Sequence, residues 1–170
     1  MSHAENKVRW CLNKAEKEIA TGTKHRGLVK TNPDIPKARD HITKAEHNLK
    51  ATLYLQKGGY SDWCSSTLFY AVYHCFLAIL AKSGYESRNQ ECTFALIESL
   101  IERGYLDITK SEMEKISMLN VEEKQHSPTV VELREEFQYG TKLSFEDKSL
   151  GELLKLSQTI LDKTKIFLEK

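Results

Sequence analysis

The sequence predicts an all-α protein, an up-and-down antiparallel four-helix bundle with an extra N-terminal helix and short additional helices. Apolar residues recur at helical spacing along most of the chain, and no stretch shows convincing period-two alternation. The 170 residues include only 8 Gly and 3 Pro, too few for a turn-rich β-sandwich. Apolar residues make up 40% and charged residues 29%, which is the composition of a single folded domain rather than a disordered chain.

The first 37 residues are expected to form an extension, a helix followed by a basic loop. An apolar stripe runs from Glu5 to Ala20, and Gly22 ends it. The stretch from Thr21 to Ile35 has no periodicity, and we expect a mobile loop that is dispensable for folding. Its basic cluster consists of Lys24, His25, Arg26 and Lys30.

Residues 38–170 are expected to form the bundle. Asp34 reads as the N-cap of its first helix, with Pro36 in the first turn, and the apolar period continues to about Lys57. Side chains that cap helices mark the later starts. In order, they are Asn89, the box Thr109-x-x-Glu112, Ser127-Pro128 and the box Ser144-x-x-Asp147.

The helix that starts at Ser61 or Asp62 and ends at Gly84 is apolar nearly all round. A surface helix of a monomer needs only one apolar face. This helix is therefore either central to the core or shared with a second subunit, and the sequence predicts a homodimer. No apolar run reaches the roughly 18 to 20 residues that cross a bilayer, so we expect a cytoplasmic protein without membrane contact.

The net charge of the chain bears on whether it binds nucleic acid. With 25 Lys and Arg against 24 Asp and Glu, the net charge of +1 gives no general argument for nucleic-acid binding. The distribution is uneven, because residues 21–50 are basic and residues 98–123 acidic.

The cysteines show no C-x-x-C spacing, and we expect all of them to be unpaired buried side chains in a reducing compartment. They are Cys11, Cys64, Cys75 and Cys92.

Common enzyme signatures are missing from the sequence, and we expect neither a metal nor a cofactor. Asp40-His41 and Glu46-His47 are neighbours on a helix, where side chains one position apart diverge by about 100°, so we interpret them as surface residues. His74 lies inside the apolar helix. It is either a hydrogen-bonded core residue or a functional group where two subunits meet.

The run from Ser65 to His74, followed by Leu77-Ala78-x-Leu80, resembles the Arg-x-Tyr-Tyr-Ala-x-Phe-His segment of HEPN domains. It is most similar to the short prokaryotic HEPN proteins encoded beside minimal nucleotidyltransferases. Gly58-Gly59-Tyr60 resembles the turn before that segment, and Arg134 to Tyr139 resembles the family's Arg-x-x-x-x-Tyr element. The likeness covers about residues 38 to 170 and implies a four-helix bundle that dimerises.

Many HEPN proteins are RNA-cleaving toxins with an Arg-x(4–6)-His motif, and others are non-catalytic binding subunits. Here Thr67 stands where the family has an arginine before the aromatic pair, and Tyr139 follows Arg134 where the nuclease motif has histidine. A phenol with a pKa near 10 is a poorer base at neutral pH than an imidazole with a pKa near 6.5. The tyrosine in place of the histidine therefore favours a binding role over RNA cleavage.

The resemblance therefore implies an accessory subunit of a toxin–antitoxin type of module, paired with a nucleotidyltransferase and contacting nucleotide or RNA. The expected ligand-binding residues are Arg134, Tyr139, Tyr70 and His74. One alternative is a metal-independent ribonuclease in which His74 or His126 replaces the missing base. Another is a non-catalytic nucleic-acid-binding protein that uses the Lys24-His25-Arg26 loop. Arg134 also has a purely structural interpretation, in which it holds helix ends together.

Overall fold

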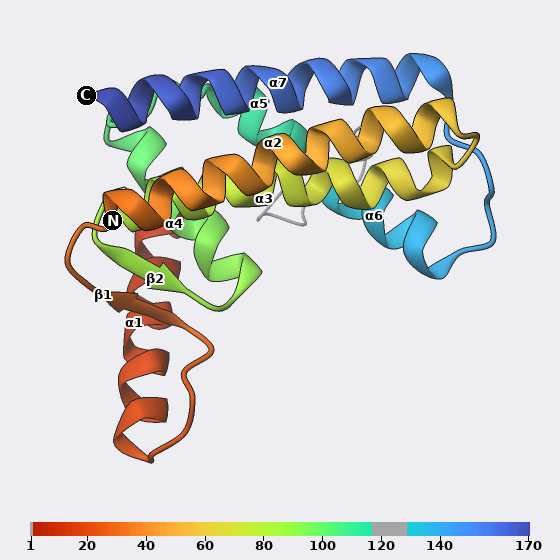
Figure 1. Cartoon of the computed structure of the whole chain (residues 1–170). Coiled ribbons are helices and arrows are strands. Elements are labelled where there is room, and N and C mark those ends of the chain that lie inside the picture. The colour runs from red at the N-terminus through yellow and green to blue at the C-terminus, as the bar shows by residue number, and fades with distance from the viewer. Residues whose placement is uncertain (1, 117–128) are drawn as a thin grey trace.

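A computed structural model describes residues 2–116 and 129–170, and these form a helical bundle (Figure 1). Its three longest helices lie side by side: α2 (Ile35–Lys57), α3 (Cys64–Lys82) and α7 (Asp147–Glu169). The Lys82 ammonium donates hydrogen bonds to the carbonyls of Phe167 (2.7 Å) and Leu168 (3.0 Å), so the C-terminal ends of α3 and α7 meet. A cation there also stabilises the negative end of the α7 dipole.

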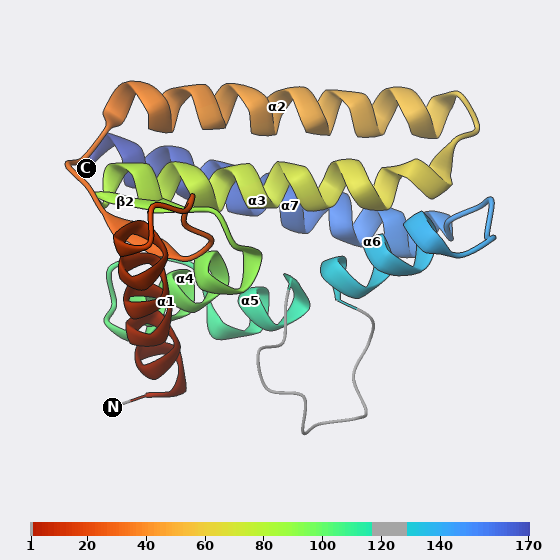
Figure 2. The same cartoon turned by 90° about the horizontal axis from the view of Figure 1, so that it is seen from below.

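Shorter helices cover the remaining side of α3 (Figure 2). They are α4 (Gln90–Glu102), α5 (Lys110–Ile116) and α6 (Val130–Tyr139). Phe76 of α3 and Phe94 of α4 meet edge to face with ring centroids 5.7 Å apart, and both are essentially fully buried. The all-α prediction is confirmed, and the fourth side of the bundle is divided among several helices.

Most of the helix starts that the sequence predicts agree with the structure. Asp34 accepts the backbone N–H of Lys37 at 2.9 Å, and Asn89 accepts that of Cys92 at 3.0 Å. The Thr109 hydroxyl accepts the N–H of Glu112, whose carboxylate accepts the N–H of Thr109 in return.

Three starts differ from the prediction. The central helix α3 begins at Cys64, after a short 3₁₀ turn, rather than at Ser61 or Asp62, and no side chain caps it. Thr129 caps α6 and forms a capping box with Glu132, whereas the predicted start at Ser127-Pro128 lies outside the described residues. The last helix begins at Asp147 after Glu146, with no side-chain cap. The predicted box needs Asp147 at the third helical position, so it does not form.

The central helix occupies the core. With the preceding short 3₁₀ turn η1 (Ser61–Trp63), α3 makes a stretch of 22 residues with mean hydropathy 1.6, long and apolar enough to span a membrane. This corrects the expectation that no run has that length. Because 67% of its most apolar window is buried inside the fold, this stretch has the surroundings of a core helix.

Part of the predicted basic loop is a strand. β1 (Leu28–Lys30) pairs antiparallel with β2 (Tyr85–Ser87), and Leu28 is fully buried. The pairing continues at both ends, through hydrogen bonds from Thr31 N–H to the Gly84 carbonyl and from Arg88 N–H to the Gly27 carbonyl. The expectation of a loop is therefore wrong from Gly27 to Thr31, and the dispensability of the stretch for folding stays a prediction. Strands of three residues are too short to show a period of two.

The N-terminal helix α1 (His3–Ala20) stands crosswise to the long helices and packs on α4 (Figures 1 and 2). Cys11 of α1 and Cys92 of α4 form a disulfide across a sequence separation of 81. This corrects the expectation that all four cysteines are unpaired. Cys64 and Cys75 are free and buried, and burial raises their thiol pKa values to about 11 and about 12, which keeps both thiols protonated and unreactive.

Candidate functional site

Arg134 lies on α6 with its guanidinium carbon 4.0 Å from the ring centroid of Phe69 on α3. Its Nη1 donates to Gln90 Oε1 on α4 at 3.3 Å, and its Nη2 lies 3.4 Å from a Glu135 carboxylate oxygen. The side chain keeps 14% of its surface exposed, and Nε is buried without a hydrogen-bond partner among the described residues. Arg134 thus connects three helices while its donors remain incompletely satisfied.

The platform beneath the guanidinium is aromatic. Phe69 is 2% exposed, and its ring stacks on Tyr73 with centroids 5.6 Å apart. The Tyr70 ring meets Phe69 edge on at 5.1 Å, and the Tyr73 hydroxyl lies 3.3 Å from the Thr93 hydroxyl. A cation over a ring is attracted by the negative face of the π system, so this cluster holds Arg134 in one orientation.

The four expected ligand-binding residues do not converge. Tyr139 is the last residue of α6 and is 79% exposed. Five positions along a helix turn the side chain by about 140°, so Tyr139 and Arg134 face different directions. Tyr70 reaches the Arg134 site only through the edge of Phe69, and His74 points to α2 instead.

His74 pairs with His41, which was expected to be a surface residue. Their Nδ1 atoms are 3.0 Å apart, a hydrogen bond in which one imidazole donates and the other accepts. Burial, His41 and Lys44 lower the pKa of His74 to about 4. Burial and Lys37 also lower the pKa of His41. Both rings are therefore neutral at neutral pH, and His74 is a weak candidate for a catalytic base.

Because of this histidine pair, we expect the free energy of unfolding to fall as the solution becomes acidic. The unfolded chain binds a proton at each histidine near pH 6.5, whereas folded His74 stays neutral down to about pH 4. The stability that His74 provides through this pKa difference is present above pH 6.5 and is lost as the pH falls towards 4. We expect His74→Asn, which keeps a polar atom near Nδ1, to flatten the loss of stability between pH 7 and pH 5 in urea unfolding.

The comparison must be made between variant and natural protein because another group acts in the opposite direction. Burial, Glu102 and Glu114 raise the pKa of Glu98 to about 7, so its contribution to stability is lost as the pH rises through that value. Glu98 is the same in both proteins and cancels in the difference. Equal slopes for natural protein and His74→Asn would contradict the assignment.

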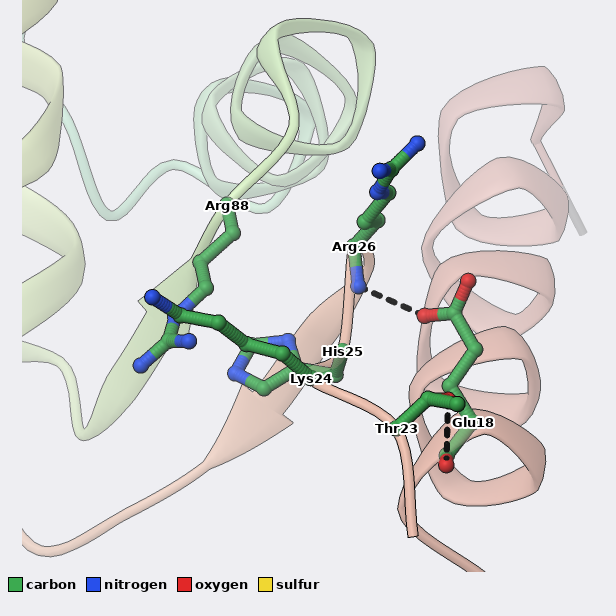
Figure 3. Close-up of a pocket in the computed structure, with 6 residues that line it drawn as sticks. All are labelled: Glu18, Thr23, Lys24, His25, Arg26 and Arg88. Carbon is green, nitrogen blue, oxygen red and sulfur yellow. Dashed lines mark hydrogen bonds between the residues drawn. The ribbon is translucent and has the colours of Figure 1, made fainter. Parts of the chain in front are cut away.

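The basic cluster lines a pocket of about 580 Å³ at the side of the N-terminal extension (Figure 3). Its walls come from the end of α1, the segment entering β1 and the segment after β2, and the lining residues are Glu18, Thr23, Lys24, His25, Arg26 and Arg88. Lys30 is on β1 and is not part of the lining. Three of the four predicted loop residues therefore share one site.

Sequence reasoning missed three residues that the fold brings to these sites. Arg88 reaches the pocket through the pairing of β1 with β2, Gln90 meets Arg134 across 44 positions, and His41 meets His74 across 33. None belongs to a local motif that could have indicated its role. His126, the other candidate base, lies outside the described residues. Within the described part of the chain, no group of three or more His, Cys, Asp or Glu side chains could hold a metal ion.

Comparison with known families identifies the bundle. The model of the HEPN domain matches residues 38–167. The chain belongs to the HEPN family. The match includes Arg134, Tyr70, His74 and the aromatic platform, and it leaves α1 and most of the basic pocket outside. No curated protein matches this HEPN protein.

Proposed function

We propose that this HEPN protein is a non-catalytic binding subunit of a two-protein module, in which a minimal nucleotidyltransferase is its partner. The module is of the toxin–antitoxin type and works in the cytoplasm. In this proposal the HEPN protein contacts nucleotide or RNA through Arg134, and Tyr70 and Tyr139 lie on the same bundle without joining the Arg134 contacts. Its family membership and the departure from the nuclease motif support the proposal.

The observation that carries the proposal is the set of partners around Arg134. The guanidinium has an aromatic platform and two long hydrogen bonds of 3.3 and 3.4 Å, to Gln90 and Glu135. Bonds of that length are weak, so a phosphate oxygen can replace them with a shorter charge-assisted bond. In the described part of the chain no histidine is recorded among its partners, whereas general acid–base cleavage would need one within reach.

A homodimer belongs to this proposal. Large aromatic side chains stay exposed where α2 ends and α3 begins, and they are Tyr54, Tyr60, Trp63 and Tyr70. A second copy of the chain would cover such a face. Sedimentation equilibrium of the purified protein tests this part, and a monomer at micromolar concentration would contradict it.

The test of ligand contact is Arg134→Ala. We expect the affinity for ATP or a short oligouridine to fall by about 5- to 150-fold, corresponding to the roughly 1–3 kcal/mol of a charge-assisted hydrogen bond. Arg103→Ala is the matched control, because the Arg103 side chain is 57% exposed and its ion pair with Glu5 is long, at 3.8 Å. Arg134→Lys keeps the charge. If Arg134→Ala does not fold, and Arg134→Lys folds but does not regain the affinity, then Arg134 has a purely structural role.

Catalysis is tested on the same samples with labelled RNA in EDTA. We expect no cleavage by the natural protein above a buffer control, whereas Tyr139→His restores the spacing of the nuclease motif and provides a gain-of-function comparison. Robust cleavage by the natural protein that disappears in His74→Ala would overturn the binding-subunit proposal. It would support the ribonuclease alternative.

A further inference from the structure

The pocket lined by Lys24, Arg26 and Arg88 has an excess of positive charge. Glu18 is the single carboxylate among its lining residues, and one of its oxygens is already occupied by the backbone N–H of Arg26 at 2.5 Å. Glu86 is not among the lining residues, but its Oε1 accepts Arg88 Nε at 2.8 Å and lies 3.4 Å from His25 Nε2. Among the described residues only Nε of the Arg88 guanidinium has a partner, so its other donors remain available.

Two of the cations have no partner within the described chain. No hydrogen bond or ion pair is recorded for the Lys24 ammonium or the Arg26 guanidinium there, and both residues are exposed. His25 lines the same wall, and its Nδ1 is buried without a hydrogen-bond partner among the described residues. Lys24 and Arg88 point to the same side of the pocket in Figure 3, while Arg26 points away along α1.

The whole extension shares this charge. Residues 1–37 contain eight lysines and arginines against four carboxylates, a net charge of +4. The chain as a whole has a net charge of only +1, so residues 38–170 carry −3. A basic appendage on an acidic body attracts polyanions to one place. The extension lies outside the matched HEPN segment, so the pocket is an addition to the family's bundle.

We propose that this pocket binds phosphate groups, as a ligand site that shares no residue with the contacts of Arg134. Lysine supplies a point charge and arginine a fork of donors, the two side chains that bind phosphate best. Among the described residues, the lining contains no Phe, Tyr or Trp on which a nucleobase could stack, and its one aromatic ring is the His25 imidazole. The pocket therefore recognises the phosphates of a ligand rather than its bases.

The phosphate groups could belong to the backbone of RNA or to a free oligophosphate, and the experiment distinguishes these two ligands. The full-length protein is titrated against labelled 12-nucleotide oligouridine by fluorescence anisotropy and against tripolyphosphate by calorimetry. The double variant Lys24→Gln/Arg88→Gln removes the two charges that point to the same side of the pocket. Lys30→Gln is the matched control, because Lys30 is an exposed lysine on the adjoining strand and outside the lining.

We expect the double variant to bind at least about tenfold more weakly, with a salt slope shallower by about one to two, and Lys30→Gln to bind within about twofold of the natural protein. Binding of oligouridine alone would identify a nucleic-acid backbone as the ligand. Binding of both probes would identify a short run of phosphates. Binding of neither probe, an equal loss in Lys30→Gln, or competition by polyglutamate as strong as by RNA at equal charge would overturn the proposal. Arg134→Ala separates it from the proposed function, since only the latter predicts a loss in that variant.

Discussion

Removal of the Cys11–Cys92 disulfide is expected to lower the free energy of unfolding by about 4.5 kcal/mol. In the chain-entropy account, a crosslink stabilises by restricting the unfolded state, and a loop closed over a separation of 81 residues corresponds to roughly this value. Typical domains are stable by only about 5–15 kcal/mol, so the loss is a large fraction of the total. Urea unfolding of the oxidised protein and of Cys11→Ala/Cys92→Ala measures it.

The control is the response to a reductant. The natural protein should lose stability in dithiothreitol, whereas the double variant should unfold at the same urea concentration with and without it. Cys64 and Cys75 are buried thiols without a disulfide and should not respond. The role of the crosslink would be disproved if the oxidised natural protein and the variant unfolded together.

The second large effect is expected at Phe69. Phe69→Ala should cost about 3–5 kcal/mol, because a buried aromatic ring is lost and a cavity remains. The ring is 2% exposed, stacks on Tyr73 and supports the Arg134 guanidinium, so the variant also releases Arg134 from its fixed orientation. Unfolding in urea measures the stability, and nucleotide affinity measures the effect on Arg134.

Two variants make the Phe69 result specific. Phe69→Leu fills most of the volume and should cost less, but it removes the π face and should still weaken the ligand contact of Arg134. Tyr105→Ala is the aromatic control, because Tyr105 is 65% exposed and should change stability by no more than about 0.5 kcal/mol. A loss at Phe69 no larger than at Tyr105 would mean that the aromatic platform is not part of the core.

The sequence alone determined the helices and most of their ends. Apolar spacing and capping side chains act over three or four residues, and so Asp34, Asn89 and the box Thr109-x-x-Glu112 lie at the predicted starts. The resemblance carried by the central helix also predicted the HEPN family, which the match to residues 38–167 confirms. Local patterns were sufficient here because the interactions themselves are local.

Only the tertiary structure decided which distant residues meet. The disulfide joins positions 81 apart, the histidine pair positions 33 apart, and the Arg134–Gln90 bond positions 44 apart. Arg88 enters the basic pocket because two three-residue strands pair, and such short strands leave no period in the sequence. These contacts depend on how α1, α4 and α6 pack around α3, and packing is settled by the burial of whole faces rather than by any single motif.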